Sequence, residues 1–411
     1  MSLPDGYLSV TCRASFIIIF ATLTVLVAAP ARAQSVTATR AAREGLRLPM
    51  ASRTTPTQGA AAQPEPSIYD RVWRFAEWYR NDKARFVQRV QFTGRYQHDF
   101  ALVNADQGDH DEWNVRRFRM GGRVTMFRTF VLHGEVELEP QDHDPLYVRL
   151  TDFYLQWNGN PRAVIQVGKQ AVQFTSEGAT SSRELISIDR SNLANNIWFP
   201  QEYVPGVSVS GRVAPWVYRL GVYSSGAMNR EFGEFTGGVF TMAILGYDFG
   251  PKLGLREALV TGNYIYQQED ANNTFTRELG HVLSIHTRFE DPTWGLRTDV
   301  ARGAGYLSQP DLWSVMAMTF LNVTPRLQIV GRYVVVKSGD VNGVRLATYE
   351  NQVVSGRGDR YEDFYAGANY YFYAHRLKLQ TGLQWAEMRD RANDRGAYAG
   401  VAWTSGVRVG W

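Results

Sequence analysis

From Phe86 onward, apolar and polar residues alternate along the chain with a period of two, which is the spacing of a β-strand. Residues 86–97 place four apolar side chains on one face and five polar ones on the other: Phe86, Val90, Phe92 and Tyr96 against Arg89, Gln91, Thr93, Arg95 and Gln97. The same alternation recurs at 130–139, 216–223 and 376–385. The pattern predicts an all-β protein whose strands each have an apolar and a polar face.

Short and long breaks alternate between these strands. Short turns lie near 127–129, 158–162, 214–215, 250–252, 291–292, 324–325 and 373–375. Longer polar breaks lie near 99–112, 140–146, 170–203, 224–237, 267–278, 303–311, 337–361 and 388–396. Short turns at one rim and long loops at the other are typical of a transmembrane antiparallel β-barrel, because closure leaves no unpaired strand edge. We expect about 16 strands. A soluble β-sandwich or propeller is disfavoured, since no blade-like repeat is present.

The segment NVRRFRMGGRVTMF at 114–127 indicates what the two faces of such a barrel carry. Arg117, Arg119 and Arg123 share one face, and apolar side chains share the other. A lipid-facing arginine costs roughly 2–4 kcal/mol at the membrane midplane. We therefore expect these arginines to line an aqueous lumen, with Glu135 and Glu137 of the next strand beside them.

The chain before the predicted barrel divides into three parts. Residues 1–33 have an apolar run and an Ala31-Arg32-Ala33 cleavage pattern, which predicts a signal peptide rather than a signal anchor. Residues 34–67 are rich in Ala, Thr, Pro and Gln, which predicts a flexible periplasmic tail. Residues 68–84 fit either an amphipathic helix or an extended entry segment. The barrel domain is expected to occupy residues 85–411.

Composition excludes several classes of protein. The single cysteine, Cys12, lies in the predicted signal peptide, so disulfides and thiolate metal sites are excluded from the mature chain. The seven histidines show no metal-binding spacing. A net charge of +4 is not the footprint of a nucleic-acid-binding protein. We therefore expect no metal, no cofactor and no nucleic-acid partner.

The longest break, 170–203, lies between the fifth and sixth predicted strands. A loop of this length in a compact protein is usually functional or disordered. This one carries Ile186, Leu193, Ile197, Trp198 and Phe199, which can pack against other residues. We expect this third long loop to fold inward and narrow the channel.

Several stretches resemble the phosphate-selective porin family, the O and P type porins of Gram-negative outer membranes. They are RRFRMGG at 116–122, LTDFYLQW at 150–157, IQVGKQAVQFTSEGATSSRELISIDRSNL at 165–193 and GVSVSG at 206–211. The stretch FYAGANYYFYAHRLKLQTGLQW at 364–385 also fits, as does the terminal strand, which ends on Trp411. The resemblance covers about residues 85–411 and is densest before residue 215.

The resemblance implies an outer-membrane porin, a trimer of 16-stranded barrels whose inward arginines draw anions toward a constriction that holds phosphate. Carried over by motif, Arg95 corresponds to the first-strand arginine, and Arg116 and Arg117 correspond to the paired arginines of the second strand. Asp152 corresponds to the acidic residue of the fourth strand. Strict alternation places Arg116 with the apolar row, so it is the weaker member of its pair.

Two further arginines fall in the loop motif. Arg183 follows ATSS, where the phosphate-binding member of the family has a lysine, and Arg190 lies in DRSNL. Arginine keeps the charge of lysine but changes the donor geometry. The predicted pore and anion-binding set is therefore Arg95, Arg116, Arg117, Arg119, Asp152, Arg183 and Arg190, with phosphate or another small anion as the permeant solute.

Other functions remain alternatives at this stage. A broader organic-solute porin has the same architecture. A second alternative is a structural or adhesive barrel with a closed lumen, which would show no channel conductance, whereas a porin would. An outer-membrane hydrolase ranks last because no catalytic constellation is present, and GVSVSG lacks the spacing of a nucleophile elbow.

Overall fold

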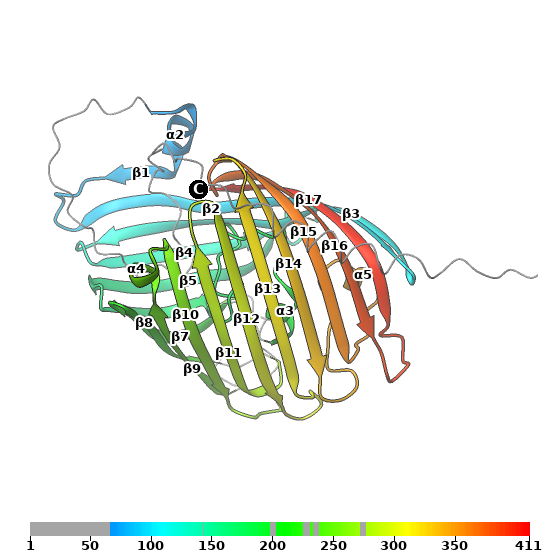
Figure 1. Ribbon diagram of the computed structural model, residues 1–411. Coiled ribbons are helices and arrows are strands. Elements are labelled where there is room, and N and C mark those ends of the chain that lie inside the picture. The colour runs from blue at the N-terminus through cyan, green and yellow to red at the C-terminus, as the bar shows by residue number, and fades with distance from the viewer. Residues whose placement is uncertain (1–65, 143, 198–202, 225–230, 233–237, 272–276) are drawn as a thin grey trace, which may run out of the picture. The chain divides into compact units, whose positions relative to one another are not determined.

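A computed structural model describes residues 66–142, 144–197, 203–224, 231–232, 238–271 and 277–411 (Figure 1). The predicted signal peptide at 1–33 and the predicted tail, apart from its last two residues, lie outside these ranges. Within them, no helix has the length and apolar character needed to cross a membrane.

Antiparallel strands make up most of the described chain (Figure 1). The strands of the first half are β2 (Val87–Ala105), β3 (Gly108–Met126), β4 (Phe130–Leu138), β5 (Tyr147–Asn160), β6 (Ala163–Ala171), β7 (Tyr203–Val213), β8 (Trp216–Ser224) and β9 (Val239–Asp248). Those of the second half are β10 (Glu257–Gln267), β11 (Leu279–Glu290), β12 (Trp294–Gly305), β13 (Leu312–Asn322), β14 (Leu327–Ser338), β15 (Arg360–Tyr373), β16 (Leu377–Arg389) and β17 (Tyr398–Gly410).

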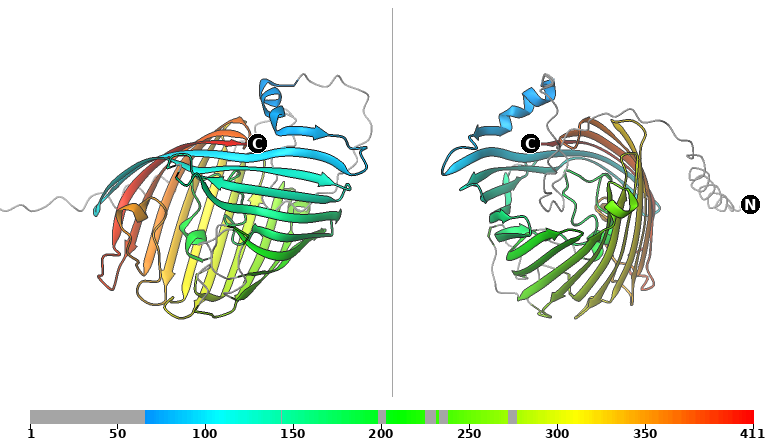
Figure 2. Two further views of the ribbon diagram at one scale, coloured as in Figure 1. Left: turned by 180° about the vertical axis from the view of Figure 1, so that it is seen from behind. Right: turned by 60° about the vertical axis from the view of Figure 1, so that its left-hand side comes forward.

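Each of these 16 strands pairs with its neighbours in chain order. The last strand closes the ring on the first, since β17 pairs with β2 from Gly400 opposite Ala105 to Gly410 opposite Arg95 (Figure 2). The expected 16-stranded antiparallel barrel is therefore confirmed. Because the barrel closes, the backbone N–H and C=O groups of the first and last strands pair with each other. At an open sheet edge these groups would be unpaired.

The burial pattern follows the predicted alternation of faces. On β11, Leu283 and Ile285 are exposed, whereas the alternating residues Ser284 and His286 are buried. Large exposed apolar side chains lie on strands all around the barrel, among them Leu220, Leu245, Val300, Trp313, Ile329, Phe364, Leu383 and Val401. The outside of the barrel is thus apolar, as a barrel in a membrane requires, and the inside combines polar groups with the apolar cluster that packs against the long loop.

The short turns fall where the sequence places them, but one long break does not. Residues 99–112 were expected to form a polar loop, and this is wrong. β2 and β3 are 19 residues each and continue to a hairpin whose turn is Asp106 and Gln107. Within this extension Ala101 and Val103 are buried. The polarity of the segment comes from exposed side chains, not from an absence of strand.

The segment before the barrel contains both structures that the sequence left open. A helix, α2 (Ile68–Trp73), begins at a Ser67 capping box, and a short 3₁₀ turn, η1 (Arg74–Ala76), follows it. Next comes β1 (Glu77–Arg80), which pairs with the beginning of β2. Trp73 Nε1 donates a hydrogen bond to Gly410 O at 2.7 Å, so this segment is attached where β17 ends.

In the described part of the chain, three short helices lie between strands: α3 (Asn192–Ile197) in the longest loop, α4 (Gly250–Leu253) in a short turn, and α5 (Glu350–Val353) between β14 and β15. α3 packs against β12, β13 and β14 (Figure 1). The buried apolar cluster includes Phe174, Leu193 and Ile197 of the long loop together with inward residues of these strands.

Candidate functional site

The first part of the site is a carboxylate shared by two arginines. Glu135 of β4 is 1% exposed. Its Oε1 accepts a hydrogen bond from Arg95 Nη2 at 2.9 Å, and its Oε2 lies 3.8 Å from Arg183 Nη2. Arg95 also donates from Nη1 to Ser182 Oγ at 2.7 Å. The barrel wall and the long loop therefore meet at Glu135.

A second shared carboxylate lies on the same strand. Glu137 Oε1 accepts from Arg119 Nε at 3.0 Å, and Glu137 Oε2 accepts from Arg149 Nε at 2.6 Å. Arg119 Nη1 also donates to the hydroxyl of Tyr203, and both guanidiniums lie near the Tyr203 ring, 5.0 and 5.9 Å from its centroid. The expected proximity of Glu135 and Glu137 to the arginine row is confirmed.

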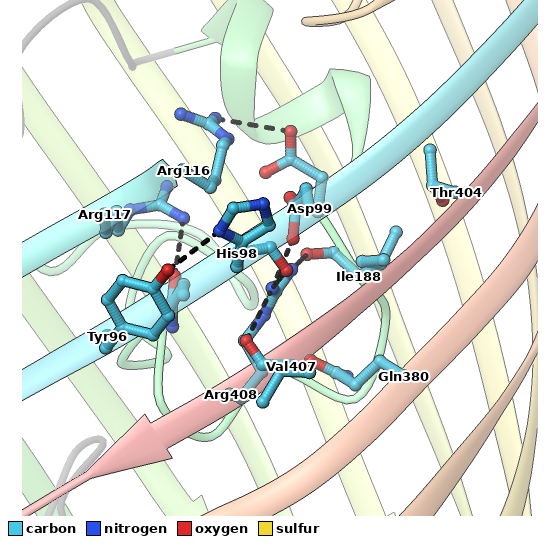
Figure 3. Close-up of polar contacts among 12 residues, drawn as sticks. Tyr96, His98, Asp99, Arg116, Arg117, Ile188, Gln380, Thr404, Val407 and Arg408 are labelled. Carbon is cyan, nitrogen blue, oxygen red and sulfur yellow. Dashed lines mark hydrogen bonds and ion pairs between the residues drawn. The ribbon is translucent and has the colours of Figure 1, made fainter. Parts of the chain in front are cut away.

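A β-bulge determines the orientation of the arginine pair on β3. Gln97 pairs with Arg117 and His98 pairs with Val115, so Arg116 is an extra residue in β3. Arg116 Nη2 lies 3.4 Å from Asp189 Oδ2 of the long loop, and Arg117 Nη1 donates to Gln97 Oε1 at 3.0 Å (Figure 3). The expectation from strict alternation, that Arg116 shares the apolar row, is wrong because it did not include the bulge.

Asp189 is held by more than one group. Its Oδ2 also accepts a hydrogen bond from Thr348 Oγ1 at 2.8 Å. Burial raises the pKa of Asp189, but the positive charges of Arg116 and Arg117 outweigh burial and hold that pKa below its ordinary value. Asp189 therefore stays ionised and pairs the loop with β3.

The long loop is also attached, through its backbone, to the wall strands on the other side of β2. Leu185 O accepts from Lys378 Nζ and, at 3.1 Å, from Gln380 Nε2. Further along, Arg408 Nη2 donates to the carbonyl oxygen of Ile188 at 3.2 Å (Figure 3). Asn369 Nδ2 donates to the carbonyl oxygen of residue 186 at 2.7 Å, and Arg332 Nη1 to that of residue 189 at 3.0 Å. These donors come from β14 to β17, so the loop residues 185–189 contact several adjacent strands.

Arg190 and Asp152 occupy different surroundings from the other predicted residues. Arg190 is buried, and its guanidinium donates to Glu177 O at 3.2 Å and to Thr180 O at 3.0 Å, both within the loop. The contacts of Arg190 thus hold the loop in shape. Asp152 lies opposite Glu135 in the β4–β5 register and is half-buried.

Several functional candidates were not singled out from the sequence. Arg149 shares Glu137 with Arg119, and Arg332, Lys378 and Arg408 hold the loop carbonyls. The register Glu137 opposite Arg149 would have identified the first of these from hairpin pairing alone. The others required knowledge of how the long loop folds, which no local pattern contains.

The arrangement presents positive charge without a catalytic or metal centre. Each of Glu135 and Glu137 contacts two guanidiniums, so each group of three side chains has a formal charge of +1. Among the residues that the structure describes, no group of three or more His, Cys, Asp or Glu side chains is placed to hold a metal ion. Such a site can attract and orient an anion.

Comparison with protein families gives one match. A family model described as phosphate-selective porin O and P matches residues 90–317, which is more than half of the 411 residues. A comparison with curated protein sequences found no match.

Solved structures with this fold include several channels. The anion-selective porin from Comamonas acidovorans has a TM-score of 0.55 at 13% identity, and the match covers 78% of this chain and 99% of that one. OmpF of Salmonella typhi in complex with daunomycin has a TM-score of 0.57 at 12% identity, covering 82% and 100%. The outer-membrane channel DcaP of Acinetobacter baumannii has a TM-score of 0.51 at 14% identity, covering 81% and 99%. At these identities the likeness shows the porin fold.

Proposed function

Because this chain belongs to the phosphate-selective porin O and P family, a family of non-enzymatic outer-membrane channels, we propose that it admits small anions such as phosphate. The observation that carries the proposal is the pair of arginines on Glu135. Arg95 comes from the wall and Arg183 from the long loop, and both face one carboxylate. The surplus positive charge lies at the junction between wall and loop.

The long loop supplies the constriction in this proposal. Its residues 185–189 are tied to β14–β17, and Asp189 is tied to Arg116 on β3. A loop held on several sides narrows the path and keeps Arg183 at a fixed position. Guanidinium forks match phosphate oxygens in pairs, and a constriction of low dielectric strengthens that attraction. Asp152, beside Glu135, moderates the field.

The reversal potential across a planar bilayer in a salt gradient tests anion preference. We expect the sign that corresponds to anion selectivity, and a cation preference would overturn the proposal. Zero conductance from a folded, heat-modifiable barrel would instead favour the closed-lumen, adhesive alternative. Equal permeation of phosphate and of uncharged organic solutes would identify a broader organic-solute porin.

The role of Arg183 is tested by the variant Arg183→Ala. Phosphate is added to a chloride current, and the phosphate concentration that halves the current is measured. We expect this concentration to rise in Arg183→Ala, because one guanidinium is removed from the constriction. Arg302→Ala is the matched control, since Arg302 pairs with Asp311 and lies over the ring of Trp313, away from the long loop. Unchanged phosphate block in Arg183→Ala would remove Arg183 from the site.

Two further features are proposed on other grounds, the oligomeric state from the family and the domain boundaries from the sequence pattern. We propose a homotrimer, which native mass spectrometry of the detergent-solubilised protein tests directly. We also propose that the mature chain begins at Gln34, with the barrel domain from residue 85. N-terminal sequencing of protein purified from outer membranes would contradict the first boundary if it began elsewhere.

A further inference from the structure

Three arginines meet at the end of the barrel that carries the long loops. Arg277 lies just before β11, and Arg345 and Arg357 lie in the segment between β14 and β15. None of them belongs to the predicted pore set. Their positions relative to one another follow from backbone pairing and from hydrogen bonds to α3.

Backbone pairing brings Arg345 and Arg357 close together. Val344 and Gly358 form an isolated antiparallel bridge, in which Val344 N donates to Gly358 O at 2.9 Å and Gly358 N donates to Val344 O at 3.0 Å. Residues 345 and 357 are the next positions beside this bridge, and burial and the charge of Arg357 both lower the pKa of Arg345. Like charges in this position repel each other.

Arg277 completes the group through shared partners. Its Nη1 donates to Asn196 Oδ1 at 2.8 Å, the same oxygen that accepts from Arg345 N at 2.8 Å. Its Nη2 donates to Gly343 O at 2.7 Å and to the amide oxygen of Gln309. All of these partners are neutral.

The Arg277 guanidinium is buried, and one of its hydrogen-bond donors has no partner. The residue is 3% exposed, and its Nε has no hydrogen-bond partner. Burial lowers the pKa of Arg277, and the charges of Arg345 and Arg357 lower it further. A buried cation that faces two more cations is costly unless an anion accompanies it.

The acids of the described chain do not supply that anion. Glu278 is the acid whose charge acts on both Arg277 and Arg345, and its Oε2 accepts a hydrogen bond from Ser308 Oγ at 3.1 Å. Within the described ranges, no ion pair within 4.0 Å joins any of the three arginines to a carboxylate. Residues 272–276, NNTFT, carry no acid in the sequence.

We propose that Arg277, Arg345 and Arg357 bind a small multiply charged oxyanion, of which inorganic phosphate is the probe, at the loop-bearing end of the channel. The proposal rests on the proposed function for the source of the anion, a permeating solute rather than a lipid headgroup. Asn192 and Asn196 of α3 both donate to Arg345 O, and α3 packs on β12 to β14, so the group is attached to the same loop that carries Arg183.

The test measures the thermal unfolding midpoint of the full chain in detergent at pH 7.5, in chloride and in phosphate of equal ionic strength. We expect phosphate to raise the midpoint in a saturable manner. In the double variant Arg345→Gln and Arg357→Gln, the midpoint in chloride should rise because the repulsion is relieved, and the phosphate increment should be lost. Arg302→Gln, which removes one charge elsewhere, should keep the increment.

Three outcomes separate the possibilities. An unchanged phosphate increment in the double variant, with the increment lost in Arg183→Ala, would overturn this site and leave the proposed function standing. Loss of the increment in the double variant, together with a cation-selective reversal potential of the unmodified chain, would support the site and overturn the proposed function. A midpoint shift with lipopolysaccharide but none with inorganic phosphate would overturn the solute source.

Discussion

The negative charge of Glu135 should lower the anion selectivity of the channel, so neutralising Glu135 should make the channel more anion-selective. Its carboxylate contacts Arg95 at 2.9 Å and Arg183 at 3.8 Å. Glu135→Gln keeps an oxygen that can accept from Arg95 but removes one negative charge from the junction of wall and loop. The two guanidiniums then act on a passing ion without the opposing charge of Glu135.

The size of the effect follows from Coulomb's law. For an ion that passes roughly 8 Å from Glu135, one unit charge changes the energy by about 0.5 kcal/mol at the dielectric constant of water and by about 2 kcal/mol at an effective value of 20. These energies correspond to a change of about 2-fold to 30-fold in the local concentration of a monovalent anion, and the local concentration of a monovalent cation changes by the same factor in the opposite direction. A buried pair that loses one partner also costs about 3 kcal/mol of stability.

The assay is the reversal potential of Glu135→Gln in a planar bilayer with a salt gradient, after a gel shift on heating has confirmed a folded barrel. Glu387→Gln is the matched control, because Glu387 lies on β16 and pairs with Arg389, a largely exposed residue, at 3.5 Å. We expect the control to leave the reversal potential unchanged. A shift of folded Glu135→Gln toward cations, or no shift, would refute the reasoning.

Three further predictions concern stability. Gly121→Ala should lower the unfolding midpoint, at a cost of about 1–3 kcal/mol, because a Cβ there would meet a β4 carbonyl oxygen at 2.1 Å; Gly122→Ala, with no neighbour closer than 3.7 Å, should be tolerated. Burial, with a smaller contribution from a nearby carboxylate, raises the pKa of Glu350 to about 7. The folded state thus holds its proton longer, and calorimetry should show up to about 3 kcal/mol of stability lost as the pH rises from about 4.5 to 7, but not in Glu350→Gln. Trp73→Phe should cost about 1 kcal/mol in denaturant titration by removing the bond from α2 to β17.

The barrel was predictable because its determinants are local. Alternation with a period of two and the spacing of turns fix the number and order of strands, and both are visible in a single sequence. The break near 99–112 failed for a physical reason. β2 and β3 extend beyond the neighbouring β4, and most of the exposed side chains near their hairpin turn are polar, so strand and loop have a similar composition there.

The site was only partly predictable, because its geometry depends on contacts between distant residues. Alternation oriented Arg95, Arg117 and Arg119 correctly, but the bulge at Arg116 needs the β2–β3 register. Arg190 has the composition of a pore residue, yet it bonds carbonyls of its own loop. No spacing rule distinguishes an arginine that faces solute from one that holds a backbone turn.

The long loop is anchored mainly through its backbone, so different groups hold the loop in place and present its charge. Wall side chains donate hydrogen bonds to carbonyl oxygens of the loop, and every residue has such an oxygen. The donors are Lys378, Gln380, Arg332 and Arg408. Of the loop residues that accept these bonds, Asp189 is also held through its side chain, which pairs with Arg116. Arg183 lies two residues before Leu185, the first loop residue that these donors hold, and its side chain adds a contact of its own, from Nη1 to Trp411 O at 3.0 Å. Under the proposed function, the wall strands fix where the constriction lies, and the loop side chains determine which charge it presents.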